Sequence, residues 1–161
     1  HYAELFADDA PWRARAERIA QKVRDVNEFL ASLTPRAARG PIALRAAYHD
    51  ACHLAHAQGV REAPRRLLRT IPGLELLEIP SGDQCCGSAG VYNLLQPGSA
   101  REIGERKVDN VLSVRPDALI SANPGCTLQI AAQLSERRVR LPAYHPIELL
   151  DRSIAAGGAE R

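Results

Sequence analysis

From residue 42 onward, short apolar runs alternate with longer stretches in which apolar residues recur every three or four positions. We interpret four runs as buried strands: "IALRAAYH" (42–49), "LELLEI" (74–79), "DALISA" (117–122) and "VRLPAYH" (139–145). Helices are predicted over about 61–70, 98–113 and 126–136, with a closing helix from residue 146 and a frayed tail "AAGGAER". This alternation is typical of an α/β fold, so we expect a parallel sheet of about four strands flanked by helices.

The first 36 residues show a different pattern. Asp9 is a candidate N-cap and Pro11 falls in the first turn of a predicted helix. One apolar stripe continues along that single helix: Ile19, Val23, Val26 and Leu30. The stretch "TPRAARGP" (34–41) reads as a linker. We therefore divide the chain into a lead-in with an amphipathic helix, residues 1–36, and an α/β domain, residues 37–161.

The composition is that of a soluble globular domain: 161 residues, 45% hydrophobic and 25% charged. A net charge of +2 is too small to support nucleic-acid binding. No apolar run approaches the roughly 18 residues of a membrane-spanning helix. The chain begins at His1, contains no methionine and shows no secretory signal. We expect a piece of a longer cytoplasmic protein, whose cysteines serve a metal or redox site instead of disulfides.

Each cysteine group follows a predicted strand and precedes a predicted helix. Cys52 follows the first strand, Cys85 and Cys86 the second, and Cys126 the third. Since parallel strands end at one edge of the sheet, these cysteines should converge at its carboxyl edge. Four thiolates suit an iron–sulfur cluster or a structural zinc, and helix N-termini would stabilise their charge. Adjacent cysteines reach different atoms of a cluster more easily than one ion, which favours iron–sulfur.

Several neighbours of the cysteines are candidates for supporting roles. Gly87 lets the backbone pass close to a bulky inorganic core. His49 could be a further ligand or a hydrogen-bond donor to a cluster sulfur, but we favour a role in capping the loop through Asp50 and backbone groups. Asn93 is a candidate hydrogen-bond donor that would tune the potential of a cluster.

The other histidines and a group of arginines are interpreted as surface or structural residues. His53 and His56 are expected at the surface, and His145, which precedes a proline at a strand end, is expected to be structural. Four arginines would form one basic helical face: Arg61, Arg65, Arg66 and Arg69. A solvated face is the favoured interpretation, and a docking surface for an acidic protein partner is the alternative.

Three stretches, "YHDACHLAHAQG", "CCGSAGVYNLLQP" and "ANPGCTLQI", resemble the cysteine-rich CCG domain family. Members occur in heterodisulfide reductases, in lactate-utilisation proteins and in the iron–sulfur subunit of glycolate oxidase. The resemblance is greatest to the C-terminal part of the last, and there it includes the leading "RAERIAQKVRDVNEFL". It covers most of the chain and implies the second of two CCG repeats in a subunit that also carries a ferredoxin-like region.

The resemblance implies that Cys52, Cys85, Cys86 and Cys126 hold a [4Fe–4S] cluster, cubane or non-cubane. Asn123 stands where the family's Cys-x-x-Cys pair has its first cysteine. An ordinary cubane, a ligand from outside this stretch of chain and zinc therefore all stay open.

The implied activity is electron transfer within a hydroxy-acid oxidoreductase complex. A flavin-containing subunit would oxidise glycolate to glyoxylate, and this domain, not itself catalytic, would relay the electrons. A membrane-quinone acceptor would place the complex at the inner face of the cytoplasmic membrane. A lactate-type system would look much the same, since the flavin subunit chooses the substrate.

Two other classes of function stay open at this point. A zinc-stabilised binding module would use the same cysteines without redox chemistry. A thiol redox enzyme would use Cys85 as nucleophile and Cys86 or Cys52 to resolve the mixed disulfide, and it would need a depressed thiol pKa.

Overall fold

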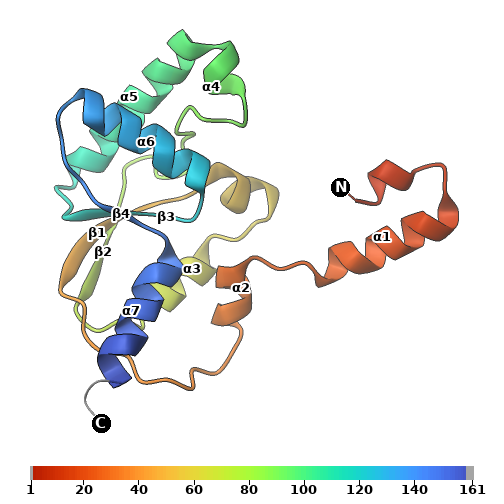
Figure 1. Ribbon diagram of the computed structural model, residues 1–161, viewed down its shortest axis with the longest axis horizontal. Coiled ribbons are helices and arrows are strands. Elements are labelled where there is room, and N and C mark those ends of the chain that lie inside the picture. Colours follow the sequence, from red (N-terminus) through yellow and green to blue (C-terminus); the bar gives the residue numbers. More distant parts are fainter. Residues whose placement is uncertain (1, 159–161) are drawn as a thin grey trace.

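The computed structural model describes residues 2–158 and shows a parallel sheet between two layers of helices (Figure 1). The strand order is β2-β1-β3-β4, and every neighbouring pair is parallel. The strands are β1 (Leu44–His49), β2 (Leu74–Glu78), β3 (Ala118–Ser121) and β4 (Ala143–Tyr144). The predicted fold class is thus confirmed.

Helical segments precede, connect and follow the strands. They are η1 (Glu4–Phe6), α1 (Ala10–Lys22), α2 (Val26–Ala31), the π-helical turn η2 (His53–Ala57), α3 (Glu62–Leu68), α4 (Tyr92–Leu95), α5 (Pro97–Ser113), α6 (Pro124–Glu136) and α7 (Pro146–Gly158). None of these helices, in the part of the chain that the structure describes, is long and apolar enough to cross a bilayer.

Alternate residues of the central strands enter two separate cores. Ala47 and Leu119 face α5 and α6, where they join Val108 and Ile130. The neighbouring side chains of β1 and β3 point the other way, and Tyr48 packs there with residues of α3 and α7. Both central strands are buried from Ala46 and Ala118 onward, which explains why they read as continuous apolar runs.

The edges of the sheet and the helix boundaries differ in detail from the expectation. The fourth strand has only two residues, because Pro142 cannot donate to the ladder and Pro146 already begins α7. The four-residue α4, between Gly90 and Pro97, was not expected, since it is too short to show a helical period. The predicted tail is helical as far as Gly158, and its last three residues lie outside the described part of the chain.

The single amphipathic helix expected near the N-terminus is wrong. Asp9 does cap α1, accepting a hydrogen bond from the backbone N–H of Trp12. However, Val23 is extended, and Asp25 caps a second helix, α2, by accepting from the N–H of Asn27. The strong cap thus interrupts the apolar stripe. α2 packs on α3, whereas η1 and α1 extend away from the sheet (Figure 1). The domain division at residue 36 stays a prediction.

Candidate metal centre

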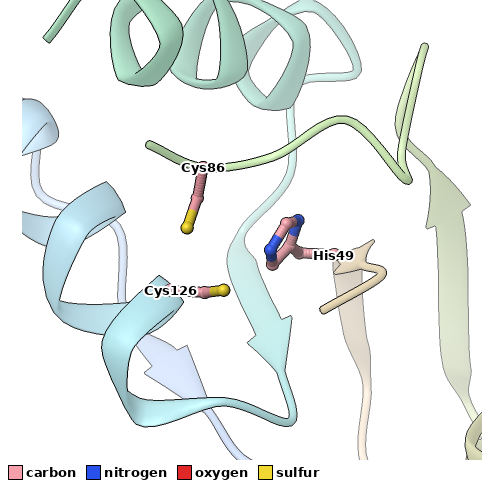
Figure 2. A group of neighbouring side chains, drawn as sticks. All are labelled: His49, Cys86 and Cys126. Atoms are coloured by element: carbon pink, nitrogen blue, oxygen red, sulfur yellow. The ribbon is translucent and has the colours of Figure 1, made fainter. Parts of the chain in front are cut away.

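Three buried side chains meet at the carboxyl edge of the sheet: His49, Cys86 and Cys126 (Figure 2). One ring nitrogen and the two sulfurs lie within 4.8 Å of one another. His49 is the last residue of β1, Cys86 lies in the loop after β2, and Cys126 lies in the first turn of α6. All three side chains point toward one another, so segments far apart in sequence form one group.

The strand order explains why the group forms there. The chain runs from β1 to β2 on one side of β1, and then crosses to β3 on the other side. In parallel α/β sheets such a reversal leaves a crevice at the carboxyl ends of the two central strands. His49 pairs with Ser121 in register at the end of β1 and β3, so it lies at this switch point.

His49 does not cap the loop as expected. The side chain is fully buried, and among residues 2–158 neither ring nitrogen has a hydrogen-bond partner of normal geometry. Buried polar groups are almost always satisfied, so an orphaned imidazole that faces two thiols is notable. Imidazole and thiolate are the donors that zinc and iron sites use in proteins.

Cys52 and Cys85 form a second, partly exposed pair beside this buried group. Burial raises the pKa of Cys85, and Cys52 lies close enough to raise it further. Cys52 and Cys126 also line a hollow of about 460 Å³, together with residues that include Ser88, Gly90 and Asn123. The four cysteines predicted to converge are therefore brought to one edge, two buried and two partly exposed.

The thiols influence each other's ionisation. A hydrogen bond from Cys126 lowers the pKa of Cys86 to about 4, against the effect of burial, and His49 and the N–H of Ser88 act in the same direction. The pKa of Cys126 is raised by the same contact with Cys86 and by burial. Cys86 and Cys126 together therefore lose one proton easily and the second only with difficulty. Burial also raises the pKa of Cys85, opposite to what a Cys85 nucleophile requires.

The loop after β2 depends on Gly87. Its φ of +91° lies in the left-handed region, and a Cβ there would lie 2.4 Å from the carbonyl oxygen of Ala100. Its N–H donates to the Cys85 sulfur at 3.3 Å. Gly87 therefore lets the loop pack against α5 and aims an amide proton at a candidate ligand, as thiolate sites require.

The two asparagines singled out from the sequence have other partners. Asn123 caps α6, and its side-chain oxygen accepts a hydrogen bond from the N–H of Cys126 at 3.0 Å. It positions Cys126 at the helix start, where free N–H groups favour a thiolate. The amide nitrogen of Asn93 donates to Gln129 at 3.3 Å, which ties α4 to α6.

The three other histidines in the described part of the chain lie where they were expected. His53 and His56 are exposed, and His56 contacts the carbonyl of Asp83 and the guanidinium of Arg61. The Nδ1 of His145 accepts from the N–H of Ile147 at the start of α7, which is a structural role.

The uniform basic face expected on α3 is wrong, because Arg65 points inward. Its guanidinium donates to both carboxylate oxygens of Asp50 at 2.7 Å and to those of Glu78 at 2.9 and 2.7 Å. Arg65 and Asp50 each keep only 9% of their side-chain surface exposed. Asp50 directly follows His49, so this ion pair fixes the start of the loop that carries Cys52. The docking role of the three remaining arginines stays a prediction.

Comparisons with known proteins identify a family of domains to which the chain is similar. The family model described as "CCG: Cysteine-rich domain" matches residues 46–131, a stretch that contains all four cysteines. Lactate utilization protein A of Macrococcus caseolyticus is 32% identical over 157 residues, 97% of this chain and 64% of the relative. Lactate utilization protein A of Geobacillus kaustophilus is 31% identical over 151 residues, 93% of this chain and 63% of the relative.

A further relative, the uncharacterized protein YkgE of Escherichia coli, is 32% identical over 150 residues, 92% of this chain and 63% of the relative. The chain thus spans slightly less than two thirds of the length of these relatives.

Proposed function

We propose an iron–sulfur electron-transfer function for this chain, which belongs to the CCG cysteine-rich domain family. One observation carries the proposal: cysteines from three separate loops converge with a buried histidine at the switch point of the sheet. Family membership bears out the resemblance that the three cysteine motifs suggested.

The residues present fit an iron–sulfur cluster. Cys86 and Cys126 would hold it from the buried side, and Cys52 and Cys85 from the more exposed side. The unpartnered ring of His49 is available as a further ligand or as a donor to a cluster sulfur. A bound cluster supplies one-electron transfer. The chain's own contribution is to keep the site half-buried and to direct the N–H of Gly87 at a thiolate ligand.

The substrate class is proposed from the relatives. Two of them are named for lactate utilization, which supports a subunit of a hydroxy-acid oxidation complex and favours lactate over the glycolate expected first. A flavin-bearing partner would carry out the oxidation, and this domain would receive the electrons. The glycolate-specific role stays a prediction. Reduction of the cluster by the assembled complex, with lactate and glycolate supplied in turn, would decide between the two acids.

The cluster is tested by anaerobic reconstitution of the full chain with iron and sulfide. We expect visible absorption, about four irons per chain and an EPR signal after dithionite reduction. Cys85→Ser and Cys86→Ser should lose stoichiometric iron while the far-UV circular dichroism stays that of the folded sheet. Iron content equal to wild type in both variants would refute the ligand set.

The role of His49 can be separated from a general effect of losing a histidine. His49→Gln removes the buried ring, and His56→Gln is the matched control, because His56 is exposed. We expect His49→Gln to change the EPR line shape or the iron content, and His56→Gln to change neither. An EPR line shape and an iron content equal to wild type in both variants would show that His49 does not contact the cluster.

A second candidate function is a zinc-stabilised binding module. The group of His49, Cys86 and Cys126 favours it, since three nitrogen and sulfur donors within 4.8 Å are close to the set that one tetrahedral zinc ion needs. Cys52 or Cys85 would supply a fourth ligand. Metal analysis that finds one tightly bound zinc per chain, with no visible absorption after reconstitution with iron, would select this alternative.

A further inference from the structure

A buried lysine holds the loop that carries the two adjacent cysteines. Lys107, one of only two lysines in the chain, is fully buried in the middle of α5, on the same face as Val108 and Val111. Its ammonium donates to the carbonyls of Ser81 and Gly82, both at 3.0 Å. Both carbonyls belong to the loop after β2. The cation thus ties the cysteine-bearing loop to α5.

The positive charge of Lys107 is not matched by a directly paired carboxylate in the part of the chain that the structure describes. Within residues 2–158, no acidic side chain forms an ion pair with Lys107. Asp50 and Asp83 are near enough to stabilise its charge. However, Asp50 is bound by Arg65, and Asp83 is half-exposed and pairs with Arg61. A buried cation is costly unless an anion compensates it, so a further negative group nearby stabilises Lys107.

The thiols of the candidate metal centre are the candidates for that group, because Val108, which follows Lys107, lies in the same core as Cys86 and Cys126. Burial lowers the pKa of Lys107, and among the charges that raise it again Cys86 contributes most, with Cys126 also contributing. A cluster held by thiolates is negatively charged, and reduction adds one further negative charge. A fixed cation in the same low-dielectric interior therefore stabilises the reduced cluster more than the oxidised one.

We propose that Lys107 is a positioning residue of the cluster site, which holds the loop of Cys85 and Cys86 against α5 and raises the reduction potential of the bound cluster. This inference rests on the proposed function, because it requires a redox-active cluster. A lysine suits the role, since its compact ammonium can donate to two backbone carbonyls and still present its charge to the thiolates.

The test is a redox titration, followed by EPR, of the reconstituted full chain and its variants. Lys107→Met and Lys107→Gln remove the charge, and the glutamine keeps an N–H donor for the loop carbonyls. At the wild-type midpoint potential we expect both to lower the ratio of reduced to oxidised cluster at least tenfold, which corresponds to about 59 mV for one electron. Lys107→Arg keeps the charge and should stay within threefold of wild type.

Lys22→Met is the matched control. Lys22 is exposed in α1, so this variant removes the same charge from the surface and should leave the ratio unchanged. Equal potentials in wild type and the neutral Lys107 variants, at equal iron loading, overturn the inference and leave the proposed function standing. A potential that falls equally in Lys107→Arg also overturns it, since charge is then not the cause. A wild-type chain that takes up no cluster overturns the proposed function, and this inference with it.

Discussion

The ion pair between Arg65 and Asp50 allows a quantitative prediction, because it is both buried and bidentate. Replacing Arg65 by methionine keeps an apolar stem of similar length and removes the guanidinium. The change deletes two hydrogen bonds to Asp50 at 2.7 Å and two to Glu78. It also removes the contact of the guanidinium with the face of Tyr48, 4.5 Å from the ring centre.

The magnitude follows from what is left behind. Asp50 keeps only 9% of its side-chain surface exposed, so the variant leaves a buried carboxylate without its ion-pair partner. Such a loss costs about 3–5 kcal/mol. The bond to Glu78 adds little, because that side chain is 56% exposed and water solvates it once the arginine is gone. At about 2–4 °C per kcal/mol for a chain of this size, Tm should fall by about 6–20 °C.

The assay is urea unfolding of the metal-free protein, followed by far-UV circular dichroism in reductant and chelator. Arg69→Met is the matched control: it lies on the same helix end, 58% exposed and 3.8 Å from Glu62, and should cost at most about 1 kcal/mol. The double variant Asp50→Asn with Arg65→Met should cost less than the sum of its single variants, because no buried charge remains unpaired.

Two results would show that this reasoning is wrong. One is a cost below about 1 kcal/mol for Arg65→Met, which is the value of an exposed pair. The other is additivity of the Asp50 and Arg65 variants within about 0.5 kcal/mol, which would mean that the two groups do not interact energetically.

Two further predictions concern the loop and the pH dependence of stability. Gly87→Ala should destabilise more than Gly90→Ala in the same urea assay: both positions have positive φ and share a cost of about 1–2 kcal/mol, but only the first places a Cβ against the carbonyl of Ala100. Equal costs would mean that this contact relaxes freely. Arg65 lowers the pKa of Glu78, so part of the stability is present above about pH 4.5 and is lost as the pH falls below it. Glu78→Gln should therefore reduce the slope of unfolding free energy against pH in that acidic range, and an unchanged slope would contradict the assignment.

The order of strands and helices could be predicted because each signal is local. Alternation of apolar runs with amphipathic stretches depends on residues that are close in sequence, and the convergence of the cysteines then follows from the fold. Arg65 shows where this reasoning ends. By helical spacing it belongs to a basic face with Arg61 and Arg69, yet it turns inward because Asp50 and Glu78, at the ends of different strands, meet at its position. A buried ion pair between separate elements leaves no periodic mark in the sequence.

Unlike Arg65, Lys107 does leave a mark in the sequence pattern, which could have identified it as a buried residue. It falls on the stripe of α5 that also carries Ala100, Gly104, Val108 and Val111, all of them buried. A lysine within a core-facing stripe contradicts the binary pattern of the helix, and such violations tend to mark functional sites. The signal was present in the sequence, but its meaning depends on the carbonyls and thiols that the loop after β2 brings to it.

The position of His49 follows from the alternation of side chains along β1. Side chains alternate along a strand, so Tyr48 enters the core of α3 and α7, and His49 must enter the opposite side with Ala47. That side is where α6 begins at the switch point and presents Cys126 from its first turn. A shift of β1 by one residue would exchange the faces, placing an aromatic ring among the thiols and the imidazole in the apolar core. The register of β1 with β3 therefore determines that the imidazole of His49 is the side chain that faces Cys86 and Cys126.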